Sequence, residues 1–190
     1  MWTTAAGTLG LSLPGCTERR PSFNAVDITG ADYARDFALK DADGRRRTLA
    51  DFRGKAVVLF FGYAQCPDVC PTTMAEMAQV KQALGKDGDK LQVLFVTVDP
   101  ARDTPEVMKA YMSAFDPAFV ALIPTSEQLA ALSKDFKVYY KKVEGKTPTS
   151  YSMDHSAASF VYDPQGRLRL YARYGGGVQP MVADIKALLG

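Results

Sequence analysis

The chain has 190 residues, of which 47% are hydrophobic and 23% are charged, and this composition argues against a disordered chain and against a membrane-embedded bundle. Its 23 basic and 21 acidic residues give a formal net charge of +2, and no run or stripe of Lys and Arg suggests nucleic-acid binding. The length favours one compact domain with a short extension, large enough to bury a core without disulfides or metal ions.

The first residues resemble a processed leader. Residues 1–15 carry no charged side chain and are followed directly by Cys16. A hydrophobic stretch that closes on a small residue and a cysteine resembles a bacterial lipoprotein signal, in which the cysteine is lipidated after cleavage, although no basic residues precede this one. We expect residues 1–32 to be a signal-like segment and polar tether, and residues 33–190 to be the folded domain. The alternative is a disordered tail with an incidental cysteine.

The folded domain opens with a hairpin signal and a buried strand. Asp43-Gly44 lies between the short segments 37–39 and 47–49 and predicts a β-hairpin. Residues 56–63 form a continuous apolar run, which is typical of a strand buried on both faces of an α/β sheet. Apolar residues at helical spacing then predict a helix from about 71 to 84.

Strands and helices continue to alternate. A second buried strand is predicted over 91–98, and Thr104 followed by Pro105 is typical of a helix N-terminus. A third strand is predicted over 119–123. The segment Thr125-Ser126-Glu127-Gln128 has the spacing of a capping box and predicts a helix that ends near Phe136.

The last third is predicted to contain a loop, a hairpin and a closing helix. Residues 150–155 are interpreted as a loop, segments 158–162 and 167–171 as a β-hairpin, and residues 180–189 as a helix. This order predicts an α/β chain of thioredoxin-like fold. It has a βαβ half, a ββα half, an insert between the two halves, and an added N-terminal β-hairpin.

Cys66 and Cys70 form the most informative pair of residues. Three residues separate them, and they lie where the first buried strand passes into its helix, at the end of a sheet where functional sites form. Pro71 suits a first helical position, which leaves Cys66 to Cys70 as a stiff turn that brings both sulfurs together. The helix macrodipole is expected to lower the pKa of both thiols and to favour thiolates, which bind metals and attack disulfides.

His155 is the single histidine of the chain and the candidate third ligand. It lies just before the ββα half, in a loop that in this fold faces the N-terminus of the first helix. Two thiolates and one imidazole suit copper, because thiolates favour Cu(I) and an imidazole also allows Cu(II) to bind. A structural zinc site would need four protein ligands, and residues 33–190 contain no fourth Cys or His. The alternative for a single loop histidine is a hydrogen-bonded residue without a metal.

Three segments resemble the Sco/SenC family of copper chaperones for cytochrome c oxidase. They are Gly62-Tyr63 with Cys66-Pro67-Asp68-Val69-Cys70-Pro71, the stretch from Val96 to Glu106, and Asp154-His155-Ser156. The resemblance covers the chain from about Asp36 to its end. It implies a metallochaperone, not an enzyme, that binds Cu(I) and Cu(II) through Cys66, Cys70 and His155.

The same resemblance implies a location and partners. It implies a membrane-anchored domain on the periplasmic face of the bacterial inner membrane. The implied partner is cytochrome c oxidase subunit II, whose two-copper centre receives the metal, with other periplasmic copper chaperones as further partners. Asp68 is interpreted as an acidic neighbour of the site, and Met74 and Met77 as packing residues. Met153 is closer to His155, and a packing role is at least as good an interpretation for it as a role at the site.

Three other functions remain open at the level of sequence. Cys66 and Cys70 can form a reversible disulfide, so the protein can instead be a thiol–disulfide reductase that keeps the oxidase copper-ligand cysteines reduced. The segment Val69-Cys70-Pro71-Thr72 resembles the peroxidatic segment of peroxiredoxins, but those enzymes need a Thr where this chain has Pro67. Copper sensing or buffering is the third alternative.

Overall fold

The computed structural model describes residues 22–147 and 150–190, so the predicted leader and Cys16 lie outside the described residues. The elements in chain order are β1 (Val26–Asp27), β2 (Ala38–Asp41), β3 (Arg46–Thr48), η1 (Leu49–Phe52), β4 (Ala56–Gly62), α1 (Val69–Ala83), η2 (Gly85–Lys90), β5 (Leu91–Thr97), α2 (Pro105–Ser113), β6 (Val120–Ile123), α3 (Ser126–Asp135), β7 (Tyr140–Glu144), β8 (Tyr151–His155), β9 (Ser159–Tyr162), β10 (Leu168–Ala172) and α4 (Val178–Leu189).

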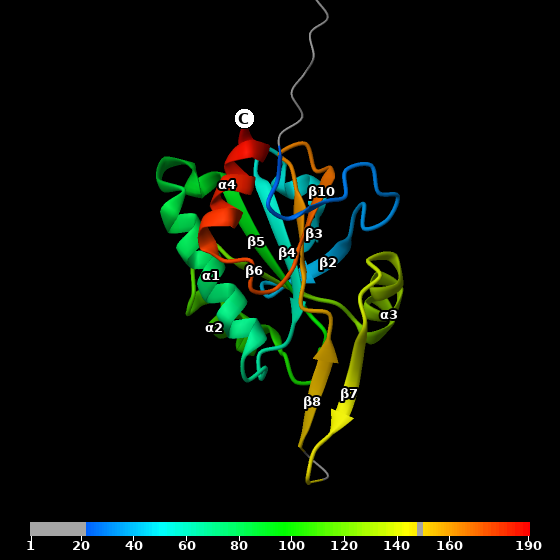
Figure 1. The fold of residues 1–190 in the computed structure, drawn as a ribbon. Helices are drawn as coiled ribbons and strands as arrows, with labels where there is room; N and C mark the ends of the chain where they lie inside the picture. Colours follow the sequence, from blue (N-terminus) through cyan, green and yellow to red (C-terminus); the bar gives the residue numbers. More distant parts are fainter. Residues whose placement is uncertain (1–21, 148–149) are drawn as a thin grey trace, which may run out of the picture.

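Eight strands form one sheet in the order β1-β10-β9-β4-β5-β6-β2-β3. Strands β4, β5 and β6 run parallel, whereas β9 pairs antiparallel with β4 and so joins the βαβ half to the ββα half. All residues of β4 and β5 are buried, as the continuous apolar run of β4 and the mostly apolar sequence of β5 predict. The predicted α/β, thioredoxin-like architecture is therefore confirmed (Figure 1).

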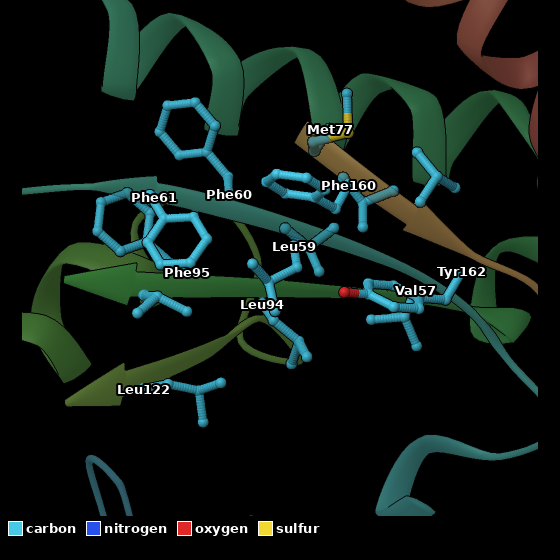
Figure 2. Close-up of a cluster of buried hydrophobic side chains, with 14 of the residues drawn as sticks. Val57, Leu59, Phe60, Phe61, Met77, Leu94, Phe95, Leu122, Phe160 and Tyr162 are labelled. Carbon is cyan, nitrogen blue, oxygen red and sulfur yellow. The ribbon is translucent and has the colours of Figure 1, made fainter. Parts of the chain in front are cut away.

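The two faces of the sheet are covered by different helices. On one face Phe95 of β5 packs on Tyr111 of α2 with 5.6 Å between ring centroids, and α1 packs on α4. On the other face Phe61 of β4 packs on Phe136 at the end of α3, with 5.3 Å between centroids. Figure 2 shows Phe61, Phe95 and Phe160 packed around the central strands, with Met77 of α1 lying against the sheet. The end of β4 and the start of α1 therefore meet over a rigid core.

The structure confirms the hairpin turns and the helix N-caps that the sequence predicts. Strands β2 and β3 form the predicted N-terminal hairpin, and the buried carboxylate of Asp41 accepts backbone hydrogen bonds from its turn. The predicted hairpin of β9 and β10 repeats this arrangement with Asp163. Thr104 and Thr125 accept hydrogen bonds from the first turns of α2 and α3, which confirms both predicted N-caps.

Three strands, β1, β7 and β8, occupy segments in which no strand is predicted. Residues 151–155, interpreted as loop, form β8, which pairs with β7 in a separate two-stranded ribbon. Strand β8 alternates over its five residues, with Ser152 and Asp154 exposed and Met153 buried, whereas β7 is mostly exposed and has no alternating apolar pattern. Strand β1, within the segment interpreted as tether, is exposed and consists of two residues that pair with the sheet edge at β10.

Helix boundaries differ by two residues from the predicted ones. Helix α1 begins at Val69, so Pro71 is the third helical residue and Cys70 lies inside the first turn. Helix α4 begins at Val178. Within residues 22–147 and 150–190, no helix combines the length and apolar character needed to span a bilayer.

Candidate metal centre

The structure brings Cys66, Cys70 and His155 together. One ligand atom from each residue, the two sulfurs and an imidazole nitrogen, lies within 4.8 Å of the others. The Sγ of Cys70 lies 3.4 Å from Nε2 of His155, although 85 positions separate the two residues in sequence. Asp68, the acidic neighbour, is exposed and is not part of this group.

Cys66 takes part in the start of helix α1. The N-cap residue Asp68 makes no side-chain capping bond to the helix. Instead the backbone N–H of Cys70, in the first turn, points at Sγ of Cys66 at a distance of 3.4 Å. Free N–H groups at a helix N-terminus favour a negatively charged acceptor, so this contact would strengthen when Cys66 is a thiolate. The half-exposed Cys66 therefore lies at the outer side of the site and Cys70 at its inner side.

Burial decides the protonation state of Cys70, and it overturns the expectation that the helix lowers the pKa of both thiols. Cys70 is completely buried, and burial, with a smaller contribution from its hydrogen bond to Cys66, raises the pKa of its thiol far above the ordinary value. Desolvation of a charge outweighs the favourable end of the helix macrodipole here. Cys70 is consequently a neutral thiol at physiological pH until a metal ion displaces its proton.

His155 is held as a neutral imidazole with one nitrogen free for a ligand. Its Nδ1 lies 3.0 Å from the carbonyl oxygen of Ser156, which can only accept, so Nδ1 carries the proton and donates it. The other nitrogen, Nε2, is therefore unprotonated and faces the Cys70 sulfur. Burial lowers the pKa of His155, and its ring lies edge-on to the rings of Phe60 and Tyr63, with 5.9 Å between centroids in each pair. A hydrogen bond of this kind on the far nitrogen is typical of metal-binding histidines.

Gly62 makes room for Cys70, a role that sequence reasoning did not assign to it. A Cβ at this position would lie 2.8 Å from the Cys70 sulfur, 2.7 Å from Phe95 and 2.8 Å from Phe60. These distances are too short for real contacts, and the neighbours lie in the buried core. A glycine at the end of a buried strand is the sequence signal for such a close approach.

We expect Gly62→Ala to destabilise the protein by about 1–3 kcal/mol, as overpacking of a core does, and to displace the Cys70 sulfur. Thermal unfolding and copper binding of the purified variant measure the two effects. Gly176→Ala is the matched control, because its nearest neighbour would be the Arg173 carbonyl at 3.5 Å, an ordinary contact. Equal behaviour of the two variants would contradict the role of Gly62.

The methionines near the site belong to the core. Met74 and Met77 are buried on helix α1, as their spacing predicts, and Met153 is buried in the middle of β8. All three belong to one hydrophobic cluster with the central strands, which agrees with a packing role.

Comparison with known proteins identifies relatives of this chain. A family model described as SCO1/SenC matches residues 26–190. A SCO2-like protein of Rickettsia felis is 32% identical over 164 residues, which are 85% of this chain and 80% of that protein. The mitochondrial SCO2 homolog of Bos taurus is 40% identical over 133 residues, which are 69% of this chain but only 50% of the bovine protein.

Solved structures of Sco proteins also resemble this chain. The structure of Bradyrhizobium japonicum ScoI with copper bound has a TM-score of 0.73 at 39% identity and covers 80% of this chain and 97% of that chain. The solution structure of apo Sco1 from Thermus thermophilus has a TM-score of 0.77 at 37% identity, with 88% and 97% covered. On the strength of its fold, its Cys-Cys-His group and these relatives, this chain belongs to the SCO1/SenC family.

Proposed function

We propose that the protein is a copper metallochaperone for cytochrome c oxidase, which binds copper through Cys66, Cys70 and His155. The observation that carries the proposal is the convergence of two sulfurs and an unprotonated imidazole nitrogen within 4.8 Å. Copper is bound in the similar Bradyrhizobium japonicum ScoI, and the Sco family is a family of cytochrome c oxidase assembly proteins. The proposed recipient is the two-copper centre of oxidase subunit II, with other periplasmic copper chaperones as further partners.

The donor set favours copper as a cargo. Two thiolates bind Cu(I), and the added imidazole allows Cu(II) as well. Among the described residues no fourth Cys, His, Asp or Glu joins the group, whereas structural zinc is held by four protein ligands. Because Cys66 is half exposed, a ligand of a partner protein can approach the metal from that side, which is the arrangement that transfer by ligand exchange requires.

We also propose that the domain is anchored on the extracytoplasmic face of the membrane through a lipidated Cys16. The support is the lipoprotein-like pattern of residues 1–16, which lies outside the described residues, and the similarity to a SCO1/SenC family lipoprotein from Bacillus anthracis at 25% identity. Bacterial lipoproteins carry several acyl chains, and one chain alone holds a protein only weakly.

The second candidate function is reduction of the oxidase copper-ligand cysteines. It is favoured by the same two sulfurs, which lie within 4.8 Å of each other with Cys66 half exposed and Cys70 buried. An accessible thiol beside a protected one is suited to disulfide exchange, in which the outer sulfur is attacked or attacks first.

Copper content tests the proposed binding function. We expect one copper ion per chain for the reduced protein and none for the Cys66→Ser, Cys70→Ser double variant, because thiolates are required as ligands. Oxidation to the Cys66–Cys70 disulfide should also abolish binding. Cys16→Ser is the matched control and should keep its copper, since this third cysteine belongs to the predicted leader and is not one of the proposed ligands. Full copper retention by the double variant would exclude the site.

A further inference from the structure

The placement of His155 depends on a ribbon that is not part of the main sheet. Strand β8 pairs with β7 alone, with His155 opposite Tyr140 at the end of the ribbon nearest the body of the protein. Figure 1 shows the ribbon extending away from the body of the molecule. Cys66 and Cys70, in contrast, lie at the junction of β4 and α1 over the rigid core. Contacts between the ribbon and the body must therefore set the distance from His155 to the sulfurs.

Arg102 contacts the ribbon and the cysteine loop of the body at the same time. Its Nη1 donates to the side-chain oxygen of Gln65, next to Cys66, at 3.0 Å, and to the backbone carbonyl of Tyr151 in β8 at 2.9 Å. Its guanidinium carbon lies 3.5 Å from the centre of the Tyr151 ring, within the range of a cation–π contact. One guanidinium therefore joins the cysteine loop to the strand that carries His155.

The loop that carries Arg102 is itself held firmly. Arg102 forms an ion pair through Nε with the buried Asp99, and Asp99 accepts a hydrogen bond from the Tyr151 hydroxyl at 2.9 Å. The next residue, Asp103, accepts from the Thr97 hydroxyl at 2.5 Å and from the backbone N–H of Ala64 at 3.1 Å. The loop therefore holds Ala64, two positions before Cys66, and also Tyr151, at the end of β8 opposite His155.

We infer that Arg102 is a positioning residue for copper binding, which holds the His155 ribbon against the cysteine loop. The inference rests on the proposed ligand role of His155. The Arg102 side chain is only 18% exposed. Its guanidinium pairs with Asp99 through Nε, donates to Gln65 through Nη1, and contacts the Tyr151 ring with its face. A lysine keeps the charge beside Asp99 but has neither the flat face nor the fixed fork of donors that this arrangement needs.

The test is a double-mutant cycle on the folded protein with Cu(II) as the probe. We expect Arg102→Lys to weaken Cu(II) binding by about tenfold, the lower end of the effect of outer-shell partners of metal ligands. The paramagnetic resonance spectrum of the bound Cu(II) should lose part of its nitrogen coupling. In a His155→Ala background the same substitution should cause no further loss, because Arg102 acts through His155.

Arg169→Lys is the matched control. Arg169 is also 18% exposed and pairs with the buried Asp163, but it bonds to Thr29 in the N-terminal segment, away from the site. It should leave Cu(II) affinity and the nitrogen coupling unchanged. If Arg102→Lys fails to fold, Gln65→Ala, which removes one exposed partner, should show a smaller loss that also disappears in the His155→Ala background.

The outcomes separate this inference from the proposed ligand set. An equal loss in both backgrounds, or no loss from the Arg102 and Gln65 variants, would overturn the positioning role while leaving His155 as a ligand. A His155→Ala variant that binds Cu(II) as tightly as the natural protein would instead overturn the ligand set and the positioning role together.

Discussion

His155→Ala should reduce Cu(II) affinity by more than the roughly 10–100-fold that an outer-shell partner is worth, because it removes a ligand itself. Cu(II) should be affected more than Cu(I), since an all-sulfur pair suits Cu(I) better. The Cys66–Cys70 pair should still cycle between dithiol and disulfide, because His155 is not needed for exchange with a partner. Competition titrations with each copper ion, and thiol counting after mild oxidation, measure the two properties separately.

The same variant separates copper delivery from cysteine reduction in cells. A strain that lacks this protein is complemented with His155→Ala and grown at low copper, and its oxidase activity is measured. Under the delivery hypothesis activity fails, whereas under the reductase hypothesis it is nearly normal because the dithiol is intact. Cys66→Ser is the control that fails under both. Complete rescue by His155→Ala would rule out delivery as the main role.

Cu(I) affinity should rise steeply with pH, by about tenfold per pH unit for each thiol proton that the metal displaces. Burial raises the pKa of Cys70 above its ordinary value of 9.0, so this thiol is protonated between pH 6.5 and 9 and must lose its proton on binding. Burial lowers the pKa of His155 below 6.5, so the imidazole is already neutral over this range and adds no proton. The proton of Cys70 alone therefore predicts that the logarithm of the Cu(I) affinity rises by at least one per pH unit.

Chelator competition at pH 6.5, 7.5 and 8.5, corrected for the pH dependence of the chelator, measures this slope. His155→Ala is the control, because it weakens the site yet keeps the Cys70 proton and should keep the slope. Direct measurement of proton release in a weakly buffered solution gives an independent count. A pH-independent affinity would mean that Cys70 is a thiolate before the metal arrives, in conflict with its burial.

The central architecture and the candidate ligands could be predicted from the sequence alone. Strand β4 has a continuous apolar run, β5 is mostly apolar, and Thr104 and Thr125 are local capping signals, so each could be recognised within a short window. The spacing of Cys66 and Cys70, with one histidine in the chain, restricted the metal site to very few residues.

The protonation states and the surroundings of those candidate ligands depend on tertiary packing. The effect of the helix macrodipole on the thiols could be predicted from the local sequence. The burial that raises the pKa of Cys70, in contrast, comes from packing that includes Gly62 and Phe95. Strand β8 alternates over only five residues, and its position depends on pairing with β7 and on the contact with Arg102. Desolvation and long-range pairing depend on residues far apart in the chain, and no periodic pattern in a short segment reports them.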